Sequence, residues 1–514
     1  MVVGFATQTR SYDTVFVDGG FARSQSSRFA DVVSPRTEES SAACPLATAD
    51  DVDRAVDAGR RAFDHGEWPR LSPSERAAAM RRIADSLDRP QADLTELGVD
   101  ETGYPIAFSE SYMASMPAIN FRMYADIAES YPFEEEREGP AARSLVRREP
   151  VGVAVAIPPF NGPLTLGTQK AAPALAAGCT VILKAPVQDP LACYVFAEAV
   201  EEAGLPPGVV GVLVADVTES ERLVTHPGVD KVSFAGSTPV GKRIAELCGR
   251  DMRRATLELG GKSAAIMLDD VDVEKAVPGI VGCSVAMLQG EICTAQSRII
   301  VPRSRYDEIV AAFAEQIAAL PVGDPADRDN VIGPMITRQH RERVEGYIKL
   351  GREEGATVKT GGGRPANIDR GWYLEPTLLA DCANDMRVSQ EEIFGPVVVA
   401  IPHDGTDDAI AIANDSPFGL SGTVWTEDDD AALDVARRVR TGTFSLTRTR
   451  STLRLPSAAS SSPASGARWE SRASRATSST SRSPSQDRLS PRRSRCPASS
   501  SLVPAPRAAS SPPG

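Results

Sequence analysis

Four short apolar segments decide the fold: "VGVAVAIPP" (151–159), "CTVILKAP" (179–186), "VVGVLVAD" (209–216) and "KVSFAGS" (231–237). They are rich in β-branched and other apolar residues and end at proline, aspartate or glycine, a pattern typical of strands. Helical stretches separate them, among them residues 191–206 and 240–250. Strands that alternate with helices predict an α/β fold with a parallel, doubly wound sheet, and ligands bind such sheets at the carboxyl ends of the strands.

The same alternation extends toward both ends of the chain. A second α/β block runs from Lys262 to about Phe444 and contains the apolar run "AAIMLDD" (264–270). The charged, turn-rich segment 131–150 lies between predicted helices and the first strand. Its composition is compatible with a projecting hairpin and equally with a solvated loop.

Two amphipathic helices are predicted near the N-terminus, at residues 48–66 and 72–89. The first follows Thr48 or Asp50 as a capping residue, and the second follows Ser72, which precedes a proline. Both starts match the preferences of helix N-termini.

The charge of the chain is distributed unevenly. The 514 residues are 42% hydrophobic, which is enough for two or more domains, and they carry a formal net charge of −13. Residues 447–514 contain 12 arginines against Glu470 and Asp487, so their +10 leaves −23 for residues 1–446. That excess of negative charge would repel a phosphate backbone, so we expect no nucleic-acid partner for the globular part.

Few features of the sequence support a membrane-bound or metal-binding function. No apolar run is long enough to span a bilayer and the N-terminal stretch "MVVGFATQTRSYDT" contains no hydrophobic region of a signal peptide, so we expect a cytoplasmic protein without a membrane partner. The eight cysteines lack CxxC spacing and the four histidines are far apart, which predicts free thiols and no metal site.

Four stretches carry possible chemistry, and each also has a purely structural interpretation. Cys293 in "LQGEICTAQSR" is a candidate nucleophile, although a lone cysteine is more often a small buried apolar residue. Glu258 in "LELGGKS" is a candidate general base whose pKa burial would raise, or else an edge carboxylate that faces water. Asn161 in "AIPPFNGP" could stabilise an oxyanion or simply form a turn, and the turn and helix start at 233–246 could hold a pyrophosphate.

As a set, "PPFNGP", "LKAP", "SFAGSTPVG", "LELGGKS", "GEICTAQSR" and "EEIFGPV" occur in the order and at roughly the spacing of the NAD(P)-dependent aldehyde dehydrogenase superfamily. The chain resembles this superfamily over about residues 12–446. The resemblance implies a Rossmann-like NAD(P)-binding domain (1–130 and 151–259), an oligomerisation hairpin (131–150), an α/β catalytic domain (260–446) and a disordered tail (447–514).

The resemblance also implies roles for individual residues. Cys293 would be the nucleophile, Glu258 the general base and Asn161 the oxyanion-binding amide. The implied cofactor residues are Lys184 for the adenosine ribose, Gly236 and Ser237 for the pyrophosphate, Glu392 and Phe394 for the nicotinamide ribose and ring, and Pro159 and Phe160 beside them.

The implied reaction oxidises a small aldehyde to a carboxylic acid through a thioester on Cys293. Family members that pass the acyl group to coenzyme A typically lack a carboxylate at the position of Glu258, so we predict the branch that hydrolyses the thioester. NAD is the expected cofactor and NADP is possible, because Val187 stands where many NAD-preferring members carry glutamate. The expected assembly is a homodimer or homotetramer.

Two further positions depart from the family pattern. Pro239 replaces a frequent glutamate, and Glu291 stands where glutamine usually precedes the nucleophile by two residues. If Glu291 points inward, its charge would raise the pKa of the Cys293 thiol, whereas an exposed Glu291 would have no effect.

The largest departure follows Leu446, where the sequence changes to serine, arginine, alanine and proline. This composition predicts disorder. Loss of one nucleotide after codon 446, read in the neighbouring frame with permitted codons, yields a family-like end containing "PFGGFKQSG", so we favour a frameshift. The alternatives are an impaired or inactive member of the family and, less favoured, a protein that binds RNA through its Arg/Ser tail.

Overall fold

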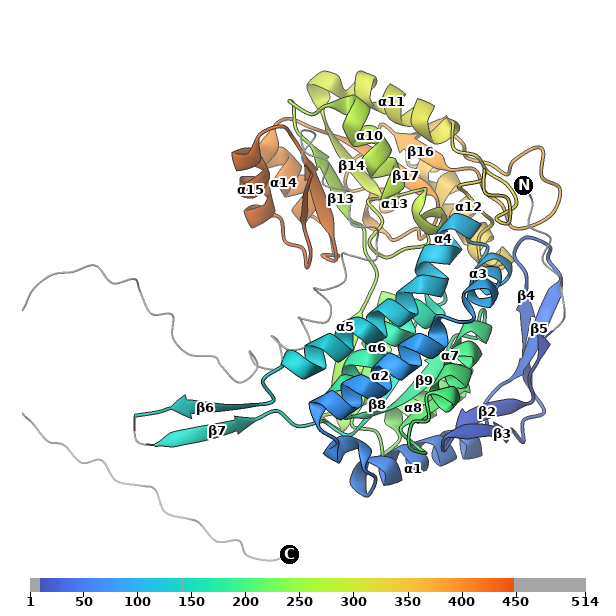
Figure 1. Cartoon of the computed structure of the whole chain (residues 1–514). Coiled ribbons are helices and arrows are strands. Elements are labelled where there is room, and N and C mark those ends of the chain that lie inside the picture. The colour runs from blue at the N-terminus through green and yellow to red at the C-terminus, as the bar shows by residue number, and fades with distance from the viewer. Residues whose placement is uncertain (1–9, 141, 448–514) are drawn as a thin grey trace, which may run out of the picture. The chain divides into compact units, whose positions relative to one another are not determined.

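The computed structural model describes residues 10–140 and 142–447 (Figure 1). The predicted tail therefore lies outside the described residues except for Thr447, which ends a strand. No helix in the described part is long and apolar enough to cross a membrane.

The first large sheet has seven strands in the order β12-β11-β8-β9-β10-β2-β3. Its strands are β2 (Thr14–Val17), β3 (Gly20–Arg23), β8 (Val153–Ile157), β9 (Thr180–Ala185), β10 (Val210–Val214), β11 (Lys231–Ala235) and β12 (Arg254–Glu258). Strands β8 to β12 are parallel, and the hairpin β2-β3 continues the sheet antiparallel to β10. The predicted parallel sheet is confirmed, and each of the four opening segments contains one of its strands.

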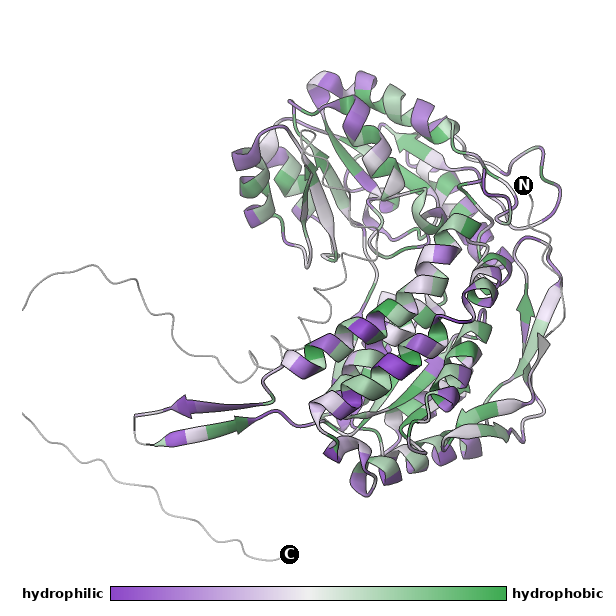
Figure 2. Cartoon of the chain, viewed as in Figure 1, coloured by the Kyte–Doolittle hydropathy of each residue, from purple (hydrophilic) through white to green (hydrophobic). Residues whose placement is uncertain are grey.

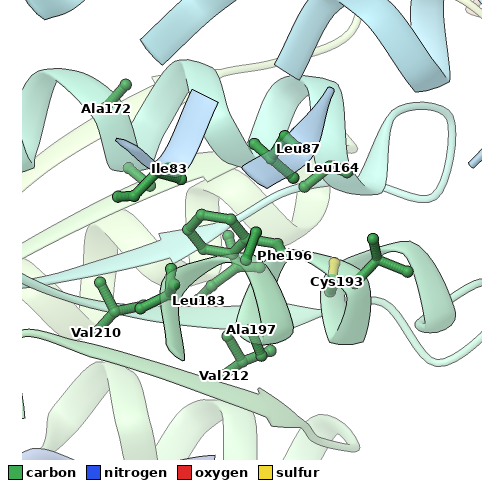
Figure 3. Close-up of a cluster of buried hydrophobic side chains, with 14 of the residues drawn as sticks. Ile83, Leu87, Leu164, Ala172, Leu183, Cys193, Phe196, Ala197, Val210 and Val212 are labelled. Carbon is green, nitrogen blue, oxygen red and sulfur yellow. The ribbon is translucent and has the colours of Figure 1, made fainter. Parts of the chain in front are cut away.

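Helices cover both faces of this sheet. The helices of this part are α1 (Ala49–Asp64), α2 (Pro73–Leu87), α3 (Gln91–Asp100), α4 (Ile106–Ser109), α5 (Met116–Ser130), α6 (Pro163–Ala177), α7 (Leu191–Glu202), α8 (Val217–Thr225) and α9 (Thr238–Arg250), with the short turns η1 (Trp68–Arg70) and η2 (Glu110–Ser115). Alternate residues of β8 enter different cores: Val153 packs with α1, α8 and α9, whereas Ala154 packs with α2, α5, α6 and α7. Figure 3 shows part of the second core, where Phe196 of α7 lies between the helices and Leu183 of β9. The sheet is therefore doubly wound, as predicted.

The predicted starts of α1 and α2 are correct. The Thr48 hydroxyl accepts the backbone N–H of Asp51 (3.2 Å), and the Asp51 carboxylate accepts the N–H of Thr48 (2.9 Å). Ser72 and Glu75 make the same reciprocal pair at α2. These boxes satisfy N–H groups that a helix start leaves without intrahelical partners.

The second large sheet has seven strands in the order β15-β16-β17-β14-β13-β18-β19. Its strands are β13 (Ala264–Met267), β14 (Arg298–Pro302), β15 (Thr357–Thr360), β16 (Thr377–Ala380), β17 (Val397–His403), β18 (Gly422–Trp425) and β19 (Ser445–Thr447). Its helices are α10 (Val273–Gly282), α11 (Tyr306–Ala318), α12 (Arg338–Glu353), α13 (Arg387–Gln390), α14 (Thr406–Asn414) and α15 (Asp429–Arg438), with the turns η3 (Met287–Gly290) and η4 (Arg303–Arg305). The strands of both sheets are mainly hydrophobic (Figure 2).

Two small sheets complete the described part. One consists of β1 (Arg10–Ser11), β5 (Ser40–Pro45) and β4 (Phe29–Val33), and the other is the hairpin β6 (Glu134–Glu138) and β7 (Arg143–Arg147). The hairpin projects from the helices around it (Figure 1), so segment 131–150 is a hairpin rather than an irregular loop. Its role in oligomerisation and the proposed domain boundaries stay predictions.

Candidate active site

The carboxyl ends of β8 and β11 mark the place where a ligand fits this sheet. From β8 the chain continues to β9 on one side, whereas β11 pairs with β8 on the other side. The strand order therefore reverses between β8 and β11, and open α/β sheets bind ligands in the crevice at such a reversal. Asn161 follows β8 and Gly236 follows β11, so both come after the strand ends that border this reversal.

The turn after β11 combines a crowded glycine with the start of a helix. A Cβ atom on Gly236 would lie 2.5 Å from the Phe234 ring, so the turn requires glycine. Ser237 is the N-cap of the 13-residue helix α9 but makes no capping bond with its side chain. Backbone N–H groups at a helix start attract anions.

Lys184 lies at the end of β9, the next strand of the same sheet. Burial lowers its pKa to about 8, while nearby acidic groups, including Asp189 and Asp216, act in the opposite direction. Val187, three residues on, is half-buried and offers no carboxylate to a ribose. The strand ends thus supply a cation, a close-approach turn and a helix start, which together fit a dinucleotide.

Cys293 lies in a strained loop that runs from Met287, the first residue of η3, to the start of β14. Leu288 and Gln289 both have left-handed backbone angles (φ 52° and 51°), which side-chain-bearing residues rarely adopt. A Cβ on Gly261 would collide with the carbonyl oxygen of Cys293, and one on Gly290 would collide with that of Gly395. The loop is therefore held tightly from two sides, and such strain is frequent at functional sites.

The thiol of Cys293 is partly buried, and its pKa is raised to about 12. Burial is the largest cause, followed by the charges of Glu392 and Glu258, while the charge of Lys170 lowers the pKa. These three side chains come from different parts of the chain, so the fold gathers them around one sulfur.

Asn161 is 2% exposed and reaches the same loop. Its Nδ2 atom donates to the backbone carbonyl of Glu291 (2.8 Å), two residues before Cys293. An asparagine amide has two donor hydrogens, so this bond leaves one for another acceptor. This long-range bond agrees with an amide held for a function in the site and goes beyond a local turn.

Glu258 is the last residue of β12, the edge strand of the first sheet, and its side chain is exposed. Of the two environments expected from the sequence, the structure has the exposed one, at the end of an edge strand. Its charge nevertheless acts on Cys293 and on Lys170 of α6.

Lys170 is a residue of the site that the sequence motifs did not predict. It is 8% exposed, and burial lowers its pKa to about 8 while the charges of Glu258 and Cys293 raise it. The available signal was a lysine inside the apolar stretch "LTLGTQKAAPALAA", where a buried charge needs a partner or a function.

Glu392 and Phe394 lie beside the nucleophile loop. Glu392 accepts the backbone N–H of Gly261 (2.9 Å), and burial raises the pKa of its carboxyl. Phe394 has a left-handed backbone (φ 61°), and its ring meets that of Phe160 edge-on at 5.7 Å. Pro159 is half-buried and accepts the N–H of Gly162 (3.4 Å). All predicted site residues thus lie at the strand ends or around the Cys293 loop.

Glu291 points inward, and a backbone N–H holds its carboxylate. It is fully buried, and Oε1 accepts the backbone N–H of Ile336 (3.2 Å). The charges that raise the Cys293 pKa come from Glu392 and Glu258. Within the described residues, no group of three or more His, Cys, Asp or Glu side chains could hold a metal ion.

A sequence profile of the aldehyde dehydrogenase family matches residues 21–459. The chain belongs to this family. It is 44% identical over 439 residues to geranial dehydrogenase of Castellaniella defragrans, covering 85% of this chain and 91% of that protein. It is 37% identical over 430 residues to the putative aldehyde dehydrogenase DhaS of Bacillus subtilis, covering 84% and 86%.

Solved structures agree with this assignment. An aldehyde dehydrogenase of Mycobacterium tuberculosis complexed with NAD+ is 43% identical, with a TM-score of 0.84 over 85% of this chain and 91% of that one. A mutant of aldehyde dehydrogenase C of Pseudomonas syringae, complexed with NAD+ and octanal, is 36% identical, with a TM-score of 0.83 over 86% and 91%. The chain is an NAD(P)-dependent aldehyde dehydrogenase that acts on small-molecule aldehydes.

Proposed function

We propose that Cys293 is the nucleophile of this aldehyde dehydrogenase, Glu258 its general base and Asn161 its oxyanion-binding amide. The observation that carries the proposal is the convergence on one thiol. Asn161 is bonded to the loop two residues before Cys293, and the charges of Glu258, Glu392 and Lys170 all act on its sulfur.

The first half of the reaction forms a thioester. Because the Cys293 pKa is raised to about 12, its thiol gives up a proton to solvent water as sulfur attacks the aldehyde carbon. The new C–S bond pushes the carbonyl electron pair onto oxygen, which accepts hydrogen bonds from the free N–H of Asn161 Nδ2 and from the Cys293 backbone. One such donor is often worth about 2.7 to 4 kcal/mol. When bound, NAD(P)+ accepts the hydride that leaves the same carbon.

The second half hydrolyses the thioester. Exposed Glu258 meets water, takes one proton from it and lets the oxygen bond to the acyl carbon. The C–S bond then breaks, Cys293 leaves as a thiolate that takes up a proton from solvent, and the carboxylic acid is released. Glu258 returns its proton to solvent, which its exposed position allows.

For the cofactor we propose NAD, with NADP possible. Lys184 would bind the adenosine ribose, Gly236 and Ser237 the pyrophosphate, and Glu392 and Phe394 the nicotinamide riboside, with Pro159 and Phe160 beside them. Val187 supports the open choice, because a valine neither accepts bonds from a ribose hydroxyl nor repels a phosphate there.

For the substrate we propose an apolar aldehyde of medium length. Tyr112 lies close enough for the Cys293 charge to act on its hydroxyl, and its ring contacts that of Phe108 at 5.0 Å. Met287 and Ile292 add partly buried apolar surface near the nucleophile. Two similar proteins support an apolar aldehyde of this kind: one is named geranial dehydrogenase, and the other was solved in complex with octanal.

Assembly, location and the chain end are also proposals. We expect a homodimer or homotetramer in the cytoplasm, and exposed Val217 and Met252 at α8 and after α9 support burial in an oligomer. DNA sequencing across codons 440–485 tests the frameshift. The RNA alternative would be favoured if the DNA encodes the sequence as given and if the protein binds RNA in a salt-sensitive way that is lost on removal of residues 447–514.

The test is a single-turnover experiment on the full chain with NAD+ and octanal. Wild type should release octanoic acid, and added coenzyme A should give no octanoyl-CoA. Glu258→Gln should produce about one NADH per site and stop at an acyl-enzyme whose mass increase maps to Cys293. Cys293→Ala should give neither NADH nor an acyl-enzyme. Turnover by Cys293→Ala, or acyl-CoA from wild type, would contradict the proposal.

A further inference from the structure

We propose that Glu291 and His340 form a buried positioning pair, which holds the nucleophile loop and Phe394 in fixed relation to each other. This inference rests on the proposed roles of Cys293, Asn161 and Phe394. Neither Glu291 nor His340 is expected to touch the substrate.

Glu291 connects two sides of the site through different atoms. Its backbone carbonyl accepts Asn161 Nδ2 (2.8 Å), and its backbone N–H donates to Leu288 in the strained loop (2.7 Å). Its carboxylate extends the other way, where Oε1 accepts the N–H of Ile336 (3.2 Å) and lies 3.6 Å from His340 Nε2. A displacement of this side chain would therefore move the backbone that carries Asn161 and the nucleophile.

His340 holds the backbone of Phe394. It lies in the first turn of α12, where its N–H donates to the capping residue Thr337 (3.1 Å). Its Nε2 is 2.6 Å from the carbonyl oxygen of Phe394, whose left-handed backbone costs free energy unless its surroundings maintain it. The imidazole also packs edge-on against Phe160 and Phe394, with ring centroids 5.8 and 5.9 Å away.

The two oxygens around Nε2 determine where the imidazole carries its proton. A carbonyl oxygen can only accept, and Glu291 Oε1 lies on the same nitrogen, so an unprotonated Nε2 would face repulsion from both. The proton is therefore on Nε2 and is directed at Phe394. Glu291 favours this tautomer, as second partners of functional histidines do.

Burial disfavours a charge on either member of the pair. It raises the pKa of Glu291 and lowers that of His340 to about 4, and Arg343 also lowers the His340 value. Glu291 Oε2 is buried without a hydrogen-bond partner, which a neutral carboxyl tolerates better than a carboxylate. A glutamate two residues before the thiol can therefore position the loop, through Asn161 on one side and through Ile336 and His340 on the other.

The test compares Glu291→Ala, His340→Leu and their double variant with His403→Ala. His403, the last residue of β17, is a matched control. It is also buried, and its Nε2 bonds a backbone carbonyl, that of Met267 (2.9 Å). We expect each pair variant to lower kcat about 10- to 100-fold with little change in the aldehyde KM, as misplacement of reacting groups does. The double variant should lose no more than the worse single variant.

A second measurement reports on the loop that carries Cys293 and needs neither cofactor nor turnover. The rate of Cys293 alkylation by iodoacetamide, with the labelled site identified by peptide mass, should change several-fold in the pair variants and stay at the wild-type value in His403→Ala. Conservative replacements should recover most of the activity, because Glu291→Gln keeps the acceptor for Ile336 and His340→Gln keeps a donor for Phe394.

These outcomes separate the inference from the proposed function. Additive losses, alkylation equal to that of His403→Ala, or a Glu291→Gln variant as damaged as Glu291→Ala would overturn the pair while Cys293 remains the nucleophile. Turnover by Cys293→Ala would instead remove the proposed function on which the pair rests. If Glu291→Ala does not fold, His340→Leu against His340→Gln decides the question.

Discussion

Replacement of Gly261 by alanine should disable the enzyme without unfolding it. Gly261 is buried after the Glu258 strand, and its N–H donates to Glu392 (2.9 Å). A methyl group at this position would fall well inside 3.0 Å of the carbonyl oxygen of Cys293, a separation that real Cβ atoms essentially never show. The next atoms, Cys293 C and Leu420 Cβ, lie at 3.4 and 3.5 Å, so the single obstacle is the peptide that carries the nucleophile.

The size of the effect follows from how far that peptide has to move. We take the displacement as roughly 1 Å, which is enough to cost about 100-fold in rate when it separates reacting groups. Overpacking of one methyl group typically costs about 1 to 3 kcal/mol, which a large chain tolerates. We therefore expect kcat to fall about 100-fold while the melting temperature drops by a few degrees.

The assay measures kcat with NAD+ and octanal, the Cys293 alkylation rate and the melting temperature in parallel. Gly346→Ala in α12 is the matched control, since no atom lies within 4 Å of its added Cβ, and alanine there should keep full kcat. Gly261→Ala with at least half the wild-type kcat would refute the reasoning, because the loop would then move without disturbing the thiol.

Three further predictions rest on the electrostatics of the site. At pH 8, Glu258→Gln should speed alkylation of Cys293 and Lys170→Met should slow it, each by up to about tenfold, because their charges shift the thiol pKa in opposite directions; equal rates would contradict this. The wild-type alkylation rate should rise steadily from pH 7 to pH 10, since the thiol pKa is about 12, and a plateau near pH 9 would be inconsistent with the structure. The folded pKa of His340 is about 4, below the unfolded value of 6.5, so its contribution is present above pH 6.5 and is lost as the pH falls toward 4. Between pH 7.5 and 5.0, the free energy of unfolding of the wild type should fall by on the order of 2 kcal/mol more than that of His340→Gln, as measured from urea midpoints. Identical midpoint shifts would argue against a buried neutral imidazole.

Local signals were sufficient for much of the fold. Thr48 and Ser72 cap helices through contacts three residues away, and the apolar runs at β8, β9, β10 and β11 are long enough to be strands without further context. The short strands β1 to β5 carry weaker patterns, from which no distinct prediction followed. Their pairing depends on partners distant in the chain, such as β2 with β10.

The site was predictable only where the family motifs reach. The motifs located Asn161, Glu258 and Cys293, but their geometry depends on long-range packing that no spacing reveals. Lys170 and His340 belong to no quoted motif, and each meets the site through a residue more than 40 positions away. Burial supplied the missing information, since a charge or imidazole that the fold removes from water needs partners.

The position of Glu258 accounts for two demands on the same carboxylate. A base that activates water has to meet water, and the edge of the sheet exposes this side chain. Burial and Glu392 are the larger causes of the raised Cys293 pKa, and the negative charge of Glu258 adds to them, so it helps keep the resting sulfur protonated and protected from alkylation and oxidation. Removal of the charge should therefore make the thiol more reactive and the enzyme less active. A single substitution that moves these two quantities in opposite directions is what distinguishes a base from a group that only tunes the thiol.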